Sequence, residues 1–376
     1  MPIRSIPAVY MRGGTSRALI FRREHLPEDQ KLWDEIFLAA LGSPDPYGRQ
    51  LNGMGGGTSS LSKVAVVGPS ERPDADVDYT FAQVSVTESK VDYKGNCGNI
   101  SSAIGPYAIE QGWFRSAGSH ASVRIYNTNT QKIIHSHFPT SQGQPEYQGD
   151  LSIPGVAGTG APIRLEFLSP GGATTGQLLP SGRVLDVLAI PELGEIEVSL
   201  IDAANACVFV DANSLGLQGT ELPAEFDTHP EWLEKLDLIR RYASVAMGIA
   251  RDIEHAKSFI AIPYVGMVSR SQNFQPLGES YTEASAMDFS MRVIASGQPH
   301  KALPLTVSLC AAVASQISGS VVAKVVADAS EEVRIGMPSG VLTLAAQVEN
   351  ENGHWKVHSG SFYRTARLLF EGRVFY

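Results

Sequence analysis

The sequence is poor in cysteine and has no long apolar run. Its three cysteines, Cys97, Cys207 and Cys310, lie far apart and form no Cys-x-x-Cys pair, which argues against a disulfide framework. The first 18 residues are too polar for the apolar core of a signal peptide, and no later run reaches the length of a membrane span. We therefore expect a protein of the reducing cytoplasm that is neither exported nor anchored.

Positive charge is also scarce. The chain has 30 Lys and Arg against 39 Asp and Glu, a formal charge of -9, and so lacks the basic field that nucleic acid or an anionic membrane surface requires. We expect neither of these partners. An anionic ligand would have to be captured by local cations and backbone N–H groups.

Several common enzyme signatures are missing. The nine histidines show no His-Glu-x-x-His spacing, and Gly-x-Ser-x-Gly and a phosphate-binding Gly-Lys-Ser/Thr loop are absent. No Gly-x-Gly-x-x-Gly follows a predicted strand, as a dinucleotide site would need. We therefore expect no metal and no redox cofactor.

The 376 residues, 43% hydrophobic and 18% charged, are typical of a folded chain with two domains. The segment 154–182 is rich in Gly, Pro and Thr, and we place the domains at 1–184 and 185–376, with the last strands free to return to the first domain. Patterning predicts strands at 64–67, 77–86, 121–126, 196–201 and 207–210, and helices at 28–41, 99–109, 232–247, 281–294 and 303–317. Pro106 should restrict or kink the second helix.

Each half contains a polar turn that leads into an apolar helix, at Gly95–Ser102 and at Gln298–Thr306. The first turn sets Cys97 between Gly95-Asn96 and Gly98-Asn99. Unpaired N–H groups at a helix N-terminus lower the pKa of a thiol and can hold a carboxylate. The alternative is that Cys97 is a small buried residue flanked by turn formers.

A second candidate is Gly53–Ser60, a run with three consecutive glycines that leads through Leu61 and Ser62 to Lys63 and a predicted strand. Such a loop exposes backbone to a ligand, although it could equally be a flexible hairpin loop. A third is Met11–Arg17, whose two guanidinium groups suit carboxylates. Arg334, Met337–Gly340 and Arg364–Arg367 repeat this polar character later in the chain but could be surface positions.

Taken together, these residues resemble the family that contains 2-methylaconitate cis-trans isomerase (PrpF), methylitaconate delta-isomerase and 4-oxalomesaconate tautomerase. The resemblance spans nearly the whole chain. It is carried by Met11–Ser16, Gly42–Asp45, Met54–Lys63, Val77–Tyr79, Gly95–Asn99, Asn127–Thr130, Asp202–Asn205, His300–Pro304 and Arg364–Arg367.

The resemblance implies an α+β fold like that of diaminopimelate epimerase, with two similar domains, each a curved, barrel-like sheet around a central helix, and an active site in the interdomain cleft. It implies no cofactor and identifies Lys63 and Cys97 as the paired catalytic residues. It further suggests substrate-carboxylate contacts from Ser16, Thr58, Ser59, Asn96, Gly98 and Asn99. To these we add, from the polar and glycine-rich runs, Arg12, Arg17, Gly57, Lys301 and Ser339.

The expected activity is a cofactor-independent shift of a proton and a C=C bond, allylic or cis-trans, in a small unsaturated di- or tricarboxylate. Departures such as Ser16-Arg17-Ala18, where the family often has Ser-Lys-Gly, leave the substrate open, as does the question of a homodimer. One alternative is a non-catalytic accessory or binding protein for an aconitase-like enzyme. Another is a proline or amino-acid epimerase of the same fold, but a two-thiol epimerase would need a cysteine where this chain has His300–Pro304.

Overall fold

The computed structural model describes residues 4–376 apart from 94–95, 259–261, 279–280, 296 and 327–329. The chain forms two compact units, one made of residues 1–168 and 363–376 and the other of residues 169–362. The division suggested by the sequence, after residue 184, lies inside the second unit. The reason is that the glycine-rich segment is bonded to that unit: Gly172 N–H donates to the carbonyl of Asp202, and Asp202 N–H donates to the carbonyl of Leu178.

The first unit is a curved mixed sheet in the order β19-β1-β2-β3-β4-β6-β7-β9, parallel at β2–β3 and at β4–β6. Two short strands, β5 and β8, pair with β4 and β7. The strands are β1 (Ser5–Gly13), β2 (Ser16–Arg22), β3 (Lys63–Pro69), β4 (Val77–Val84), β5 (Val91–Asp92), β6 (His120–Asn127), β7 (Lys132–Ser141), β8 (Gln144–Pro145), β9 (Ile163–Leu168) and β19 (Ala366–Phe375).

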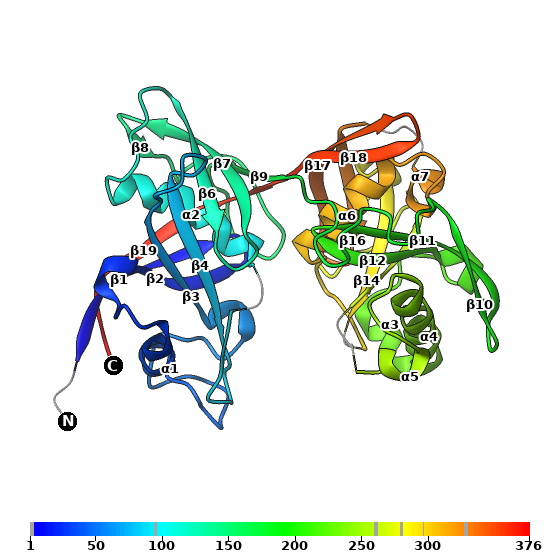
Figure 1. Ribbon diagram of the computed structural model, residues 1–376, viewed down its shortest axis with the longest axis horizontal. Coiled ribbons are helices and arrows are strands. Elements are labelled where there is room, and N and C mark those ends of the chain that lie inside the picture. Colours follow the sequence, from blue (N-terminus) through cyan, green and yellow to red (C-terminus); the bar gives the residue numbers. More distant parts are fainter. Residues whose placement is uncertain (1–3, 94–95, 259–261, 279–280, 296, 327–329) are drawn as a thin grey trace. The chain divides into compact units, whose positions relative to one another are not determined.

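Two helices cover opposite faces of this sheet. Helix α2 (Gly98–Glu110) lies among the strands and contacts β1, β2, β6, β7, β8, β9 and β19 (Figure 1). Helix α1 (Trp33–Leu41) packs its apolar face on the other side, against residues such as Tyr10, Leu19 and Val66. Side chains alternate along a strand, so each strand residue can be assigned to the α1 face or the α2 face.

The second unit has the sheet order β10-β11-β12-β13-β14-β16-β17-β18, parallel at β12–β13 and at β14–β16. The strands are β10 (Asp186–Ile190), β11 (Gly194–Ala203), β12 (Asn205–Asp211), β13 (Tyr264–Arg270), β14 (Phe289–Ala295), β15 (Gln298–Pro299), β16 (Glu332–Met337), β17 (Gly340–Glu351) and β18 (His354–Arg364). Helix α6 (Leu305–Gln316) packs against β11, β12, β13, β16 and β17. The other α-helices of the second unit, in the part that the structure describes, are α3 (Pro223–Thr228), α4 (Pro230–Ala246), α5 (Ile253–Ala256) and α7 (Val321–Val325).

The two units repeat one topology. Strands β1 to β4, β6, β7 and β9 have the same pairings, parallel and antiparallel, as β11 to β14, β16, β17 and β18. In chain order α1 corresponds to α4, and α2 corresponds to α6. The predicted pair of similar domains, each with a central helix, is therefore confirmed.

The structure contradicts one expected helix and one of the two effects expected of Pro106. Residues 281–294 form no α-helix: a short 3-10 turn (Ala284–Ala286) precedes strand β14, whose apolar residues are drawn into the sheet by pairing with β13 and β16. Pro106 does not restrict α2, which runs through it to Glu110 because strands pack around the helix and offset the one lost backbone hydrogen bond. Among the described residues no helix is long and apolar enough to span a membrane.

Candidate active site

Cys97 is the N-cap residue of α2, with extended backbone angles of φ -111° and ψ 99°. Its carbonyl accepts the N–H of Ser101 at 2.9 Å and the Ser101 hydroxyl at 3.0 Å, which fixes the turn. Asn96 Oδ1 accepts hydrogen bonds from the same hydroxyl at 3.2 Å and from Asn127 Nδ2 at 3.3 Å. The half-buried thiol thus lies at the positive end of a 13-residue helix, where a bound carboxylate is stabilised.

The turn between β1 and β2 packs directly against the start of α2, and two glycines make this approach feasible. A Cβ on Gly13 would lie 2.4 Å from the carbonyl oxygen of Asn99, and one on Gly14, whose φ is +50°, would lie 2.1 Å from Asn99 Oδ1. Any larger residue would force the helix away. The buried Ser16 begins β2 immediately after this turn, on the α2 face.

Asn99 connects this turn to a buried cation. Its Oδ1 accepts a hydrogen bond from Arg364 Nε at 3.1 Å and from Thr15 N–H at 3.4 Å. Arg364 is only 7% exposed, and burial lowers the pKa of its guanidinium to about 10, so it still carries its charge at neutral pH. A full positive charge therefore lies next to the N-terminus of α2, the arrangement that the binding of a carboxylate requires.

Lys63 is the first residue of β3 and is 9% exposed. Its Nζ donates to Gln83 Oε1 at 2.8 Å and lies 5.0 Å from the centre of the Phe81 ring. Register places Lys63, Phe81 and Tyr79 on the α2 face of the sheet, and the fully buried Tyr79 lies within electrostatic range of Cys97. Lys63 and Cys97 thus both lie on the α2 side of the sheet of the first unit.

The glycine-rich loop before β3 is built around Gln50. This side chain is 1% exposed, accepts the N–H of Gly57 at 2.9 Å and donates to the hydroxyl of Ser62 at 2.7 Å. A Cβ on Gly55 would lie 2.3 Å from the Gln50 amide. The loop is therefore fixed by packing, while Thr58 and Ser59 stay exposed on it. Gln83 Nε2 donates to the Ser59 carbonyl at 3.0 Å and so joins the loop to Lys63.

The two N-terminal arginines have other surroundings. Arg12 Nη1 donates to the carbonyl of Gly14 at 2.9 Å and to both oxygens of Thr365 at 3.0 Å, so it anchors the turn. Burial lowers its pKa, with a smaller effect from Arg367. Arg17 lies 5.6 Å above the ring of Tyr10, on the α1 side of the sheet, with its Nη2 beside Gly56 of the loop.

The remaining candidates, Lys301 and Ser339, belong to the second unit. Lys301 is exposed in the loop before α6. Ser339 lies in the turn between β16 and β17, and its buried hydroxyl has no hydrogen-bond partner among the described residues.

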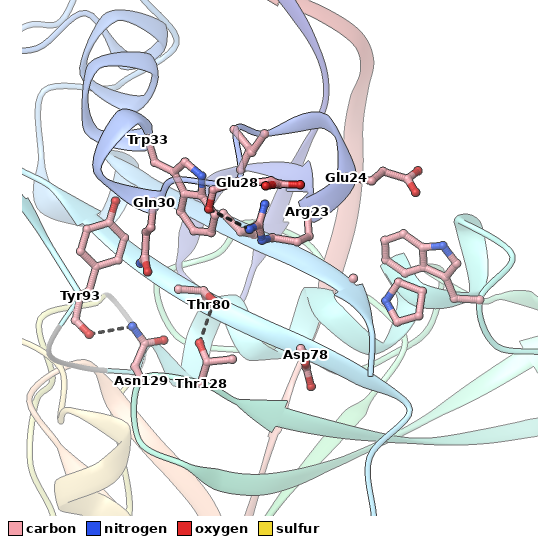
Figure 2. A pocket seen from close by; sticks show the side chains of 15 residues that line it. Arg23, Glu24, Glu28, Gln30, Trp33, Asp78, Thr80, Tyr93, Thr128 and Asn129 are labelled. Atoms are coloured by element: carbon pink, nitrogen blue, oxygen red, sulfur yellow. Dashed lines mark hydrogen bonds between the residues drawn. The ribbon is translucent and has the colours of Figure 1, made fainter. Parts of the chain in front are cut away.

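A cavity of about 940 Å³ opens on the other face of the first unit. Figure 2 shows Arg23, Trp33, Thr80 and Tyr93 around it, and Val66 lines it from β3. Val66 and Thr80 pair in register on the α1 face, opposite to Lys63. The cavity is therefore distinct from the cluster around α2.

Sequence reasoning missed three residues of the α2 cluster: Arg364, Gln83 and Gln50. The polar run Arg364–Arg367 was visible, but only the pairing of β19 with β1 brings it to the first unit. The two glutamines gave no signal, because an isolated Gln in a loop or strand is ordinary. Their importance lies in the hydrogen bonds described above.

Comparison with known proteins identifies the family of the chain. A family model described as "PrpF protein" matches residues 3–376. The chain is 38% identical to 3-methylitaconate isomerase of Eubacterium barkeri (98% of this chain, 97% of the relative). It is 34% identical to 2-methyl-aconitate isomerase of Shewanella oneidensis (99% and 97%) and 34% identical to 4-oxalomesaconate tautomerase of Pseudomonas putida (98% and 95%).

Among solved structures, a methylitaconate-delta-isomerase superposes with a TM-score of 0.92 at 37% identity, covering 100% of this chain and 96% of that one. A hydroxyproline epimerase from Agrobacterium vitis gives a TM-score of 0.53 at 13% identity, with 99% and 93% covered. The second likeness concerns the fold alone. It agrees with the expected epimerase-like architecture.

Proposed function

The chain belongs to the PrpF family, and from that premise we propose that it is an isomerase that moves a proton and a C=C bond within a small unsaturated di- or tricarboxylate. The observation that carries the chemistry is the start of α2, where the Cys97 thiol, Asn99 and the charged Arg364 lie together. A carboxylate bound there would place its neighbouring carbons beside a proton-transfer group.

The reaction begins with removal of a proton from an allylic carbon. Lys63 or Cys97 takes this proton, and the C–H electron pair moves into the allylic system and onto a carboxylate oxygen as a dienolate. Return of a proton to the far allylic carbon completes a 1,3-shift. Rotation about the former double bond in the dienolate, followed by return of a proton to the original carbon, gives the cis-trans product instead. The atoms balance without a redox partner, since one proton leaves and one is added.

The dienolate intermediate needs stabilisation where its charge develops. The N–H groups at the start of α2 and the Arg364 guanidinium supply fixed positive charge beside Asn99. The turn at Gly13 and Gly14 also brings Thr15 and Ser16 to the start of α2, beside Asn99. Lys63, held by Gln83 at 2.8 Å, is oriented before a substrate arrives.

The three substrates named for the relatives are the candidates: methylitaconate, 2-methylaconitate and 4-oxalomesaconate. All three carry carboxylates that suit Arg364 and the N-terminus of α2. The loop Gly57–Ser59 contributes exposed hydroxyls to the selection among them.

A two-thiol epimerase is disfavoured by one observation. The N-cap residue of α6, which corresponds to α2 in the repeat, is Pro304, and Cys310 is fully buried inside that helix. The second unit therefore offers no thiol at the matching position. An accessory binding protein would use the same carboxylate site but would not need Cys97.

Exchange with heavy water tests the proton shift. The purified protein is incubated with each candidate acid in D2O, without added metal or nucleotide, and the product is examined by proton NMR after several turnovers. We expect deuterium at the reprotonated carbon, because a proton held on nitrogen or sulfur exchanges with solvent, with some internal return if the site is shielded.

Ultraviolet absorbance of the same mixtures reports a shift in conjugation. Turnover with complete retention of substrate hydrogen would contradict a solvent-exchanging proton shift. Absence of any spectral change with all the acids, together with measurable binding, would favour the accessory protein.

A further inference from the structure

Strand β7 carries two histidines on its outward face. His135 and His137 are two residues apart, so they point to the same side of the sheet. Between and beside them, Ile134, Ser136 and Phe138 are buried on the α2 face, where a Cβ on Gly105 of α2 would lie 2.6 Å from the Ser136 hydroxyl. The two imidazoles therefore lie on the side of the sheet away from α2.

The neighbouring strand adds a carboxylate in register. Glu166 of β9 faces His135 across the antiparallel pair. Its Oε2 lies 3.3 Å from His137 Nε2 and 3.8 Å from His135 Nδ1, and one ligand atom from each of the three residues lies within 4.8 Å of the others. We propose that His135, His137 and Glu166 form a binding site for a divalent transition-metal ion, with Zn²⁺ as the reference ligand.

The chemistry of the donors suits that class of ion. Two imidazole nitrogens and one carboxylate oxygen are a ligand set that zinc uses when it keeps a fourth position for water, whereas Mg²⁺ and Ca²⁺ prefer oxygen. Tetrahedral zinc with bonds of about 2.0–2.1 Å needs ligand atoms roughly 3.3 Å apart. The two distances to Glu166 are 3.3 and 3.8 Å and the two imidazole nitrogens lie within 4.8 Å of each other, so side-chain rotations would complete the site.

Partial exposure provides access. The side chains of His135, His137 and Glu166 are 26%, 29% and 19% exposed, so an ion can enter from solvent and retain water. Their positions on two paired strands hold the ligands in place without a flexible loop.

Two arginines are neighbours on this face. Arg124 of β6 is opposite His135 but is neutralised by Asp76 at 2.8 Å. Arg164 of β9 is opposite His137, and its charge opposes any cation. This repulsion should weaken binding of ions that rely on charge alone and favour those that bond strongly to imidazole.

A metal ion bound there would cross-link β7 and β9 on the face of the sheet opposite to the α2 cluster. The site is therefore independent of the proposed isomerase residues, and its test does not rely on turnover. Full-length protein freed of metal with EDTA is titrated with Zn²⁺ against a chromogenic chelator, and with Co²⁺ followed by visible absorption. We expect one ion per chain and a rise in Tm on zinc addition.

Variants identify the ligands. His137→Gln and Glu166→Gln should each weaken zinc binding at least about tenfold. A matched control is His358→Gln: His358 also bonds a carboxylate, Glu349 at 2.8 Å, but offers a single imidazole, and its loss should leave binding unchanged. Circular dichroism verifies folding, and His135→Gln replaces any variant that fails this check.

Two results would overturn the site. One is wild-type protein that binds neither Zn²⁺ nor Co²⁺ below millimolar concentration. The other is stoichiometric binding that persists unchanged in the His137 and Glu166 variants, which would assign the ion to other residues.

Discussion

The two units are built alike but differ at the positions proposed for catalysis. An ion pair is repeated in detail: Arg124 donates from its backbone and side chain to Asp76, and Arg334 does the same to Asp288. Asp76 directly precedes β4 and Asp288 directly precedes β14, and each arginine lies on the strand that pairs with that strand in parallel, β6 or β16. The framework has thus been kept in both halves.

The contrast lies at the helix starts and at the third strands. Cys97 caps α2, whereas Pro304 occupies the same position at α6. Lys63 faces Ala18 across β2–β3, and Tyr264 is in the corresponding place, facing Cys207 across β12–β13. The second unit therefore has neither a thiol nor an amine at these two matching positions, and the proposed proton-transfer pair does not follow from the fold alone.

The largest effect should come from Lys63→Ala. Loss of a positioned acid or base is expected to lower kcat by about 10²–10⁴-fold. Lys324→Ala, which removes a half-exposed lysine of the second unit paired with Glu197 at 2.8 Å, should leave turnover unchanged. Steady-state kinetics with circular dichroism measures both. A Lys63→Ala enzyme with wild-type kcat would show that the difference between the units at this position does not matter for catalysis.

Cys97→Ser should be nearly as damaging. A serine hydroxyl titrates far above a thiol and cannot replace it in proton transfer near neutral pH, so we expect kcat to fall roughly 10²-fold or more. The comparison is Cys310→Ala, at a buried thiol that donates to the Ile201 carbonyl at 3.5 Å; this change should lower Tm but not kcat. Equal loss of kcat in both variants would show that Cys97→Ser lowers kcat by destabilising the protein and not by removing a proton-transfer group.

Arg364→Lys should act mainly on binding. A lysine cannot reproduce the guanidinium fork, and losing one hydrogen bond to a carboxylate costs about 1.5–3 kcal/mol, so KM should rise roughly 10- to 100-fold with a smaller change in kcat. Because the pKa of Arg364 is lowered to about 10 by burial, the wild-type KM should be level from pH 7 to 9 and rise above about pH 10.

Arg334→Lys in the second-unit ion pair is the control and should leave KM unchanged. A wild-type KM in the Arg364→Lys enzyme would exclude the guanidinium as a substrate anchor. A KM that stays flat through pH 10 would show that its protonation does not matter for binding.

The smallest effect concerns acid stability of the second unit. Burial lowers the pKa of His300, so the folded chain holds its imidazole neutral while the unfolded chain takes up a proton first as the pH falls below about 6.5. Stability is therefore lost on acidification and regained as the pH rises. Tm measured from pH 7.5 to 5 should fall less steeply for His300→Gln than for the wild type; parallel curves would contradict this.

The sequence was most informative where chemistry and local structure coincide. Cys97 between glycine-asparagine pairs predicted the start of a helix, and α2 begins at Gly98. The run 281–294 misled because its apolar residues fit a helical period, while the partners of β14, which decide its state, lie elsewhere in the chain.

Long-range contacts could not be predicted from local patterns. Nothing near Gly13 or Gly14 indicates that Asn99 will pack against them, or that Arg364 will reach the same point. Metal motifs such as His-Glu-x-x-His follow helical intervals, whereas His135 and His137 share a face through the two-residue period of a strand, and Glu166 becomes their neighbour only through sheet register.

The discontinuity of the first unit has a consequence for how the protein is made. Strand β19 completes the sheet beside β1, and Arg364 and Thr365 come from the same late segment. A growing chain on the ribosome therefore finishes its second unit before it can finish its first. During that interval the edge of β1 lacks its partner, so translation that stops short of this segment releases a chain without the proposed site.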